Sequence, residues 1–378
     1  MKLIYIAYGN VSVFDSQVIA LLNFFVESNK LDEIILILGI DYKTQPSKEK
    51  IKNLDKRIKV KFYKQYPQYL LIENLTINSI YKTLKEIESL DEYVIHVRNE
   101  VMAHYVYKAL KSSINNSSRI IADVRGAGLE QLIEFSNKSK VTINLKRIQR
   151  KQVNKSLIKI NHISVVSESL KNYVYQKIGN DIEVRVNSCL SNNNFKFDEI
   201  ERRKTREKLN VNDDESLLLL STGGDNAWQN TIETITSLTD KNYKILNLSR
   251  TEIHHKNVIT KFVPYNEMFK YLCAADAAII FRKKGVTNQV ASPVKFSEYV
   301  CCGLPVITND SVDLITHYIT TNKCGSIVIS LDFINESLLN ELKSLDRKSI
   351  SITGQKYFGI ATIANQYVDF YRSVLNIQ

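Results

Sequence analysis

The amino-acid sequence predicts an α/β protein with two doubly wound parallel sheets. Short apolar runs of strand length alternate with segments of helical apolar spacing, and this alternation occurs twice along the 378 residues. A polar, highly charged stretch at residues 189–212 separates the two series. Because the chain is too long for one typical core, we expect a first domain at 1–190 and a second at 191–360. A helix at 361–378 is a candidate to cross back to the first domain.

The first series opens with a strand, a turn and a helix, as doubly wound domains do. The strand at 2–8 ends at Gly9, which lacks the companion glycines of a dinucleotide fingerprint, so this loop is not expected to bind a dinucleotide. A helix follows at 14–28. Further strands are predicted at 33–40, 59–64, 92–98, 119–126, 162–170 and 183–188, and further helices at 76–90, 100–113, 144–159 and 169–179.

The second series repeats the pattern. Its first strand, at 216–224, ends in Gly223-Gly224, and a helix follows at 226–238. Further strands are predicted at 243–250, 257–263, 277–282, 306–307 and 325–330, with helices at 265–276, between Pro293 and Gly303, at 311–321 and from 334 onward. Two such domains place their strand ends opposite each other across a cleft, which is where ligands bind.

The composition favours a cytoplasmic protein with anionic partners. The net charge is +11 and the pI is about 9.2, which suits nucleotide phosphates, membrane headgroups or nucleic acid without choosing among them. None of the five cysteines forms a zinc-ligand spacing, and the pair Cys301-Cys302 lies in an apolar helix, as reduced buried thiols do. We find no signal peptide and no membrane-spanning run, and a location at the inner face of the membrane stays open.

The predicted helix at 144–159 is strongly basic. It is either a surface that docks on anionic lipid or an ordinary amphipathic helix with its charged face in water, and we favour the second interpretation. Its cations are Lys146, Arg147, Arg150, Lys151, Lys155 and Lys159.

The segment SPVKFSEYV carries the main candidate site. Lys295 and Glu298 lie three residues apart on one face near the start of a short helix. They form either a surface salt bridge or a site for an anionic, hydroxylated ligand. Two more features favour the ligand: Arg282 closes the strand at 277–282, and Gly223-Gly224 let backbone amides approach a phosphate. The carboxylate of Glu298 can accept hydrogen bonds from vicinal hydroxyls. The cations, the glycine turn and this carboxylate together suggest a nucleotide-sugar as the ligand.

Other chemistries have no motif in the chain. The six histidines show no metal-ligand spacing, no DxD pair follows a strand, and there is no nucleophile elbow or P-loop. We therefore expect a mechanism without metal, cofactor or enzymic nucleophile. In the first domain, Arg125 ends the strand at 119–126, where it is either a ligand contact or simply solvated.

The run PVKFSEYVCCGLPVI, with the strand ADAAIIFR and the turn STGGDNAWQ, resembles the donor half of GT-B glycosyltransferases of the retaining, family 4-like group. The stretches IIADVRGAGLEQ and HISVVSESLKNYV resemble the first half of the same group. The resemblance implies that Glu298 takes the place of the second glutamate of an E-x7-E motif, which holds the donor ribose. It also implies that the backbone around Ala291 to Val294, which includes Ser292 and Pro293, lies along the donor sugar and phosphates.

The chain departs from the family pattern at two places. Val290 stands where the first glutamate of the motif is usual, and the basic residues that commonly follow the glycine turn are absent. We therefore expect Arg282 and Lys295 to take over the diphosphate. The candidate catalytic residues are Arg125, Arg282 and Lys295, and the candidate donor-binding residues are Gly223, Gly224, Ser292, Pro293, Val294 and Glu298.

The resemblance implies a metal-independent hexosyltransferase that moves a sugar from a UDP- or GDP-sugar to a glycan or lipid-linked glycan with retention of configuration, in bacterial surface polysaccharide synthesis. Peripheral membrane contact through 144–159 belongs to this interpretation. Two alternatives stay open: a GT-B enzyme that is not a transferase, such as a nucleotide-sugar epimerase, and a non-catalytic ligand-binding protein. Nucleic acid is not an expected partner, because only the net charge favours it.

Overall fold

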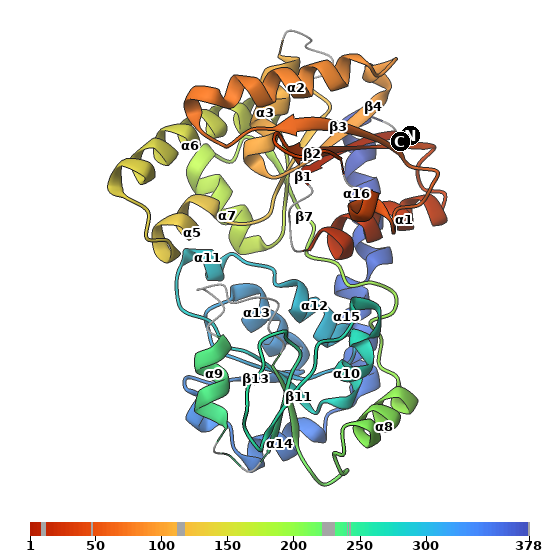
Figure 1. Cartoon of the computed structure of the whole chain (residues 1–378), viewed down its shortest axis with the longest axis vertical. Coiled ribbons are helices and arrows are strands. Elements are labelled where there is room, and N and C mark those ends of the chain that lie inside the picture. The colour runs from red at the N-terminus through yellow and green to blue at the C-terminus, as the bar shows by residue number, and fades with distance from the viewer. Residues whose placement is uncertain are drawn as a thin grey trace. The chain divides into compact units, whose positions relative to one another are not determined.

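The structure is a computed structural model that describes residues 1–8, 13–46, 48–111, 118–220, 231–239, 241 and 243–376. The chain divides into two compact units. Unit 1 comprises Met1–Ser188 and Ile363–Gln378, and unit 2 comprises Cys189–Thr362. The chain therefore returns to unit 1 after building unit 2, through the last helix, α16 (Ile360–Leu375), drawn in blue in Figure 1.

Within the described part of unit 1, seven strands form one parallel sheet in the order β3-β2-β1-β4-β5-β6-β7. Their central residues are buried, as expected for a parallel sheet that is covered on both faces. Figure 1 shows α2, α3 and α6 on one face of this sheet and α1 and α16 on the other. The strands are β1 (Lys2–Tyr8), β2 (Glu33–Asp41), β3 (Lys59–Gln65), β4 (Tyr93–Arg98), β5 (Ile120–Val124), β6 (His162–Val165) and β7 (Glu183–Val186).

Helices α3, α6 and α7 of unit 1 begin at residues whose side chains cap the first backbone amides. The side chain of Ser139 accepts from the backbone N–H of Thr142 at the start of α6, and Ser167 caps α7 in the same way. The helices are η1 (Asp15–Ile19), α1 (Ala20–Glu27), η2 (Lys48–Ile51), η3 (Leu70–Ile72), α2 (Glu73–Lys85), η4 (Leu90–Glu92), α3 (Glu100–Leu110), α5 (Gly128–Phe135), α6 (Lys140–Ile160), α7 (Glu168–Ile178) and α16.

The described part of unit 2 contains a six-stranded sheet of the same kind, in the order β10-β9-β8-β11-β12-β13. Its strands are β8 (Leu217–Leu220), β9 (Lys244–Asn247), β10 (Val258–Thr260), β11 (Ala277–Ile280), β12 (Val306–Thr308) and β13 (Gly325–Ile327). Its helices are α8 (Glu199–Lys208), α9 (Thr231–Leu238), η5 (Tyr265–Glu267), α10 (Met268–Ala274), α11 (Val286–Gln289), α12 (Val294–Cys301), α13 (Asp313–Asn322), η6 (Leu331–Phe333), α14 (Glu336–Lys343) and α15 (Arg347–Phe358). The prediction of two doubly wound α/β domains is confirmed.

The polar stretch at 189–212, for which the sequence predicts no helix, has regular structure. It contains α8, whose first amides are capped by the carboxylate of Asp198. Arg206 of this helix is only 2% exposed, and its Nη1 lies 3.2 Å from Asp276 Oδ2. The charges of this stretch are therefore partly inside unit 2, where they tie α8 to the sheet.

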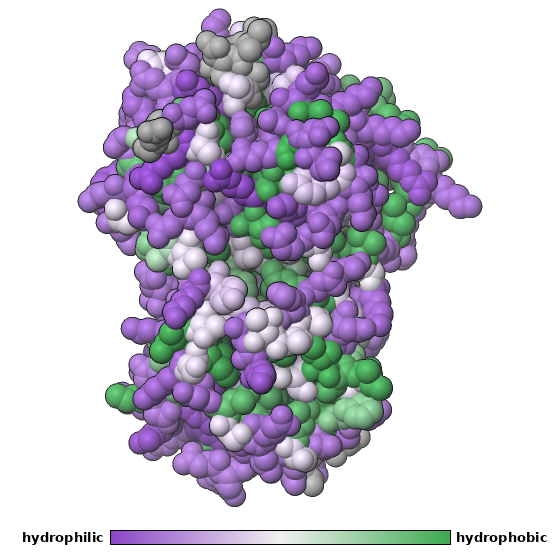
Figure 2. Space-filling view, turned by 180° about the vertical axis from the view of Figure 1, so that it is seen from behind, coloured by the Kyte–Doolittle hydropathy of each residue, from purple (hydrophilic) through white to green (hydrophobic). Residues whose placement is uncertain are grey.

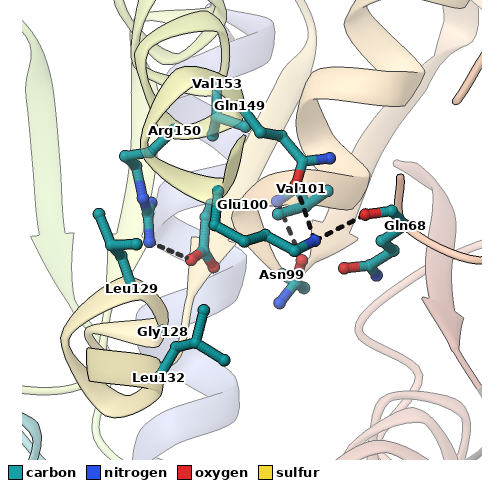
Figure 3. A pocket seen from close by; sticks show the side chains of 11 residues that line it. Gln68, Asn99, Glu100, Val101, Gly128, Leu129, Leu132, Gln149, Arg150 and Val153 are labelled. Atoms are coloured by element: carbon teal, nitrogen blue, oxygen red, sulfur yellow. Dashed lines mark hydrogen bonds and ion pairs between the residues drawn. The ribbon is translucent and has the colours of Figure 1, made fainter. Parts of the chain in front are cut away.

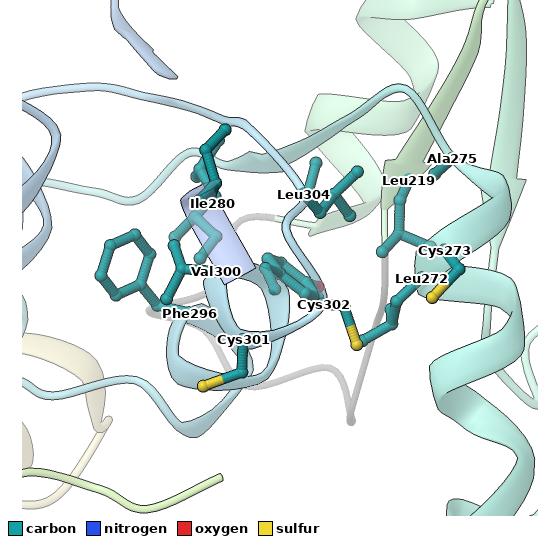
Figure 4. Packing of buried hydrophobic residues seen from close by; sticks show 14 of the residues in the cluster. Leu219, Leu272, Cys273, Ala275, Ile280, Phe296, Val300, Cys301, Cys302 and Leu304 are labelled. Carbon is teal, nitrogen blue, oxygen red and sulfur yellow. The ribbon is translucent and has the colours of Figure 1, made fainter. Parts of the chain in front are cut away.

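The core of unit 2 packs around α12. Figure 4 shows Phe296, Val300 and Cys301 of this helix among buried apolar side chains of the neighbouring elements. The helix ends where predicted, because Gly303 adopts a φ of 67° and a Cβ there would collide with the backbone carbonyl of Arg347. This packing fixes the position of the polar side chains that α12 carries.

The face of the molecule drawn in Figure 2 is mainly polar. Figure 2 shows a face on which hydrophilic side chains predominate and hydrophobic ones form separate patches. Within the part of the chain that the structure describes, no helix is both long and apolar enough to cross a bilayer.

Candidate active site

Arg282 lies just beyond β11, at the carboxyl end of the unit 2 sheet, and its neighbours hold it firmly. Asn309, which follows β12, accepts from the Arg282 backbone N–H at 3.3 Å and donates to its carbonyl at 2.7 Å. Ser311 donates to the same carbonyl. The guanidinium donates to Asn288 Oδ1 at 3.2 Å, and Asn288 is fully buried. The loop is thus fixed so that a cation stands at the ligand-binding edge of the sheet.

Lys295 and Glu298 lie on α12, and both interact with their surroundings. Glu298 is only 3% exposed, and its Oε1 accepts a hydrogen bond from the hydroxyl of Tyr265 at 2.8 Å. Lys295 is half-buried in the first turn of the helix. Glu298 favours the charged form of Lys295, whereas Arg282 disfavours it. The structure therefore brings the three predicted residues into one electrostatic neighbourhood.

The charges of this group are disfavoured by burial. Desolvation lowers the pKa of Lys295 to about 7 and the pKa of Arg282 to about 10. Burial raises the pKa of Glu298 to about 7, although the hydrogen bond from Tyr265 and the charge of Lys295 oppose this. Groups whose charge the protein stabilises poorly are typical of functional sites.

The segment before α12 is buried. Ser292 accepts from the backbone N–H of Cys189 at 3.2 Å, which ties its hydroxyl to the start of unit 2. Pro293 precedes the first helical residue, Val294. Val290 is buried at 3% exposure, so an apolar side chain fills the position before this turn. Gly223 and Gly224 lie outside the described residues.

Arg125 lies beyond β5 in unit 1, in a buried polar cluster. Its Nη1 is 3.4 Å from Asp123 Oδ1 and 3.4 Å from the hydroxyl of Tyr367 on α16. Arg98, at the end of β4, has its Nη1 3.7 Å from Asp123 Oδ2, and His96 Nε2 lies 3.5 Å from the same oxygen. Asp123 is fully buried.

Asp123 is the charge centre of this cluster. Burial alone would raise the pKa of its carboxyl, but Arg125, His96 and Arg98 outweigh burial and hold the pKa far below its usual range. Burial lowers the pKa of His96. Asp123 is thus an anion that keeps Arg125 in place.

The basic stretch at 144–159 forms the middle of α6, and its cations divide into two sets. Lys146 and Arg150 point into unit 1: Lys146 Nζ donates to the carbonyl of Gln68, and Arg150 Nη2 lies 2.8 Å from Glu100 Oε1. The interpretation of a charged face in water therefore does not hold for these two, which are half-buried. The exposed cations, spaced four residues apart, are Arg147, Lys151, Lys155 and Lys159.

Sequence reasoning missed several members of both clusters. Tyr265, Asn288 and Asn309 complete the unit 2 group, but a lone tyrosine or asparagine in a loop carries no motif. His96 and Asp123 left a signal, because each is a polar residue within an apolar strand. Within the described residues, no group of three or more His, Cys, Asp or Glu side chains is arranged to hold a metal ion.

Several solved structures are similar to the chain along nearly its whole length. Sucrose-phosphate synthase from Thermosynechococcus elongatus matches with a TM-score of 0.75 at 13% identity, over 100% of this chain and 99% of that one. HepE from Anabaena, in complex with UDP-glucose, matches with a TM-score of 0.68 at 13% identity, over 99% of this chain and 100% of that one. WaaG, a glycosyltransferase involved in lipopolysaccharide biosynthesis, matches with a TM-score of 0.58 at 12% identity, over 100% of this chain and 98% of that one.

These likenesses show the fold. It is the GT-B fold of glycosyltransferases, with the two parallel-sheet units described above. No protein-family model matches the sequence, and no curated protein matches it.

Proposed function

We propose that the chain is a glycosyltransferase that moves a sugar from a UDP- or GDP-sugar to a glycan or lipid-linked glycan acceptor. The observation that carries this proposal is the group of Arg282, Lys295 and Glu298 at the carboxyl end of the unit 2 sheet in a GT-B fold. Two cations whose charge burial disfavours gain from an anionic diphosphate. The buried carboxylate suits the hydroxyls of a ribose. HepE, which has the same fold, binds UDP-glucose.

The proposed reaction retains the anomeric configuration and needs no metal. As the bond between sugar and diphosphate breaks, Arg282 and Lys295 stabilise the negative charge on the leaving group. An oxygen of that diphosphate takes the proton of the acceptor hydroxyl, which attacks from the same face. The segment Ser292–Val294 follows the donor in this proposal. Arg125 of unit 1 is proposed as a ligand contact.

The acceptor is proposed to belong to surface polysaccharide synthesis at the inner face of the membrane. The four exposed cations of α6 lie beside apolar residues that are also exposed, namely Val141, Leu145, Ile148 and Ile158. Such a surface suits peripheral binding to anionic lipid. Co-sedimentation with vesicles that contain anionic lipid tests this part, and binding that is unchanged by the double substitution Lys151→Ala and Lys155→Ala would contradict it.

Nucleotide binding tests the donor site. UDP and GDP are titrated into the wild type and into Lys295→Ala and Glu298→Ala by calorimetry. We expect one nucleotide to bind, Lys295→Ala to weaken the diphosphate more than the bare nucleoside, and Glu298→Ala to weaken both. If neither nucleotide binds, or if both substitutions leave binding unchanged, the donor site is misassigned. NMR of the donor sugar alone separates a transferase from an epimerase, because only the epimerase converts the donor without acceptor.

A further inference from the structure

Unit 1 contains a pocket that the donor site does not use. Its volume is about 210 Å³, and it lies between the loop after β4 and the helices α5 and α6. Figure 3 shows Glu100 and Arg150 paired on one side and Gln149 and Gln68 on the other, with Leu129 and Leu132 of α5 below them. The full lining is Gln68, Asn99, Glu100, Val101, Gly128, Leu129, Leu132, Lys146, Gln149, Arg150 and Val153.

The pocket opens at the ligand-binding edge of the sheet. Asn99 follows β4 directly, and Gly128, three residues beyond Arg125, is the first residue of α5. In open parallel sheets, ligands bind outside the carboxyl ends of the strands. The pocket therefore adjoins the loop that carries Arg125, the residue proposed to contact the phosphates or the acceptor.

The walls offer both polar and apolar contacts. The amide of Gln149 donates to the hydroxyl of Tyr105 at 3.2 Å, and its Oε1 accepts from Lys146 Nζ at 2.9 Å. Leu129 and Leu132 supply an apolar surface. Apolar surface combined with fixed polar groups suits a polyhydroxylated small molecule, and the volume suits a single sugar ring rather than a larger ligand.

The pocket has an excess of positive charge. Glu100 is balanced by Arg150, at 2.8 Å. Lys146 is held by two uncharged acceptors, the carbonyl of Gln68 at 2.6 Å and the side chain of Gln149 at 2.9 Å. Among the ion pairs of the described residues, Lys146 takes part in none. Burial accordingly lowers the pKa of its ammonium. An ammonium has three donors, so an anion in the pocket adds both a hydrogen bond and the missing counter-charge.

The pocket is also rigid on its inner side. Asn99 adopts a φ of 87°, and its side chain accepts from the backbone N–H groups of Val101 and Met102 at the start of α3. Behind Gln149, His104 and Ser156 are joined by a hydrogen bond of 2.7 Å between α3 and α6. The lining residues are therefore held in place before any ligand arrives, which reduces the entropic cost of binding.

We propose that this pocket binds one sugar ring that carries an anionic group, a carboxylate or a phosphate, with Lys146 as the residue that selects the anion. Its role as the acceptor subsite rests on the proposed function, whereas the binding of an anionic sugar does not.

The test uses the full chain and three probes: glucuronate, glucose 6-phosphate and glucose. Saturation-transfer NMR titrations measure the affinity of each. We expect at least one anionic sugar to bind about tenfold more tightly than glucose, equivalent to one charge-assisted hydrogen bond. The two anionic probes distinguish a carboxylate from a phosphate. Inorganic phosphate alone is expected to bind more weakly than glucose 6-phosphate, because it lacks the ring.

Two variants locate the binding. Lys146→Met keeps the length of the side chain and removes its charge, and it is expected to abolish the preference for the anionic sugar. Leu132→Trp, on a half-buried position of α5, fills the pocket and is expected to reduce binding of every probe. Lys82→Met is the control, because Lys82 is an exposed lysine of unit 1 outside the pocket.

The outcomes separate this proposal from the donor assignment. Equal affinity for glucose and the anionic sugars, or binding unchanged in both Lys146→Met and Leu132→Trp, overturns it. UDP and GDP titrated into the same samples report on unit 2. If anionic sugars bind through Lys146 but neither nucleotide binds, the proposed donor function fails and the pocket assignment stands. If a nucleotide binds and no anionic sugar does, the pocket assignment fails and the donor function stands.

Discussion

The two sheets each carry charged residues at their carboxyl ends, but the charges are balanced in opposite ways. In unit 1, Asp123 is buried between His96, Arg98 and Arg125 and remains ionised, so the protein itself supplies an anion for these arginines. In unit 2, the pKa values of Lys295 and Glu298 both move to about 7, which means that the protein disfavours both charges. The unit 1 cluster thus contains its own buried anion, whereas we propose that the unit 2 group receives one from its ligand.

This difference separates a positioning role from a binding role. Arg125 is held by Asp123 and Tyr367, so its orientation depends on residues that never need to touch a ligand. Arg282 is oriented by uncharged groups, Asn288 and Asn309. We propose that its charge serves the ligand. Loss of Asp123 in unit 1 should therefore act mainly on folding, and loss of a cation of the unit 2 group mainly on binding.

The largest effect is expected for Asp123→Asn. The change leaves two neighbouring guanidinium groups without their buried anion, which typically costs about 3–5 kcal/mol. Urea unfolding of the two proteins measures the difference. Asp181→Asn is the control, because Asp181 is exposed. A decrease of less than about 1 kcal/mol in the free energy of unfolding would mean that Asp123 is not the anion that stabilises the two arginines of unit 1.

A smaller, pH-dependent effect is expected for Glu298→Gln. The folded-state pKa of Glu298 is raised from 4.5 to about 7, so its contribution to stability is present below pH 4.5 and is lost as the pH rises through 7. Glutamine does not titrate. The free energy of unfolding of the variant relative to the wild type should therefore increase by about 3 kcal/mol at most between about pH 4.5 and about pH 8.

Unfolding curves across this range check the sign of the change. Glu341→Gln, at an exposed position of unit 2, should show no such trend. A relative stability of Glu298→Gln that falls with increasing pH contradicts the proposed burial of the carboxylate.

Lys295→Met should weaken UDP binding by about tenfold or more, the value of one charge-assisted hydrogen bond. Because the pKa of Lys295 is lowered to about 7 in the free protein, the lysine is mostly neutral at about pH 8 and should take up a proton when the diphosphate binds. Calorimetry in two buffers of different ionisation enthalpy measures this uptake. It should disappear in Lys295→Met and persist in Lys348→Met, an exposed control.

The smallest effect is expected for Tyr265→Phe. It removes the hydrogen bond of 2.8 Å to Glu298 Oε1, which should cost about 1 kcal/mol and raise the pKa of Glu298 further. Unfolding at neutral pH measures the cost. Unchanged stability and an unchanged pH profile would place Tyr265 outside the group.

The sequence predicted the sheets well because parallel strands are buried on both faces and appear as continuous apolar runs. It also predicted the neighbourhood of Arg282, Lys295 and Glu298, since two of these share a helix face and the third ends the strand before it. It did not predict α8, because the alternating charges of this segment give no helical apolar pattern. Arg206 of this helix is buried and forms an ion pair with Asp276.

Contacts between distant segments were beyond prediction. Tyr367 lies 242 positions from Arg125 along the chain, and no local pattern joins them. The inward direction of Lys146 and Arg150 was accessible in principle, because helical spacing places Arg150 on the same face as Val153 and Leu157, which are buried. Charge alone had suggested an outward position for both.

The return of the chain to unit 1 through α16 affects the order in which the protein is made. The hydroxyl of Tyr371 on this helix lies 2.8 Å from His96 Nδ1, and Tyr367 contacts Arg125. During synthesis these partners leave the ribosome only after the whole of unit 2. At about 5–20 residues per second, the nascent sheet of unit 1 waits many seconds with this polar cluster uncovered. Its final closure is therefore a late step, which depends on the translation of unit 2.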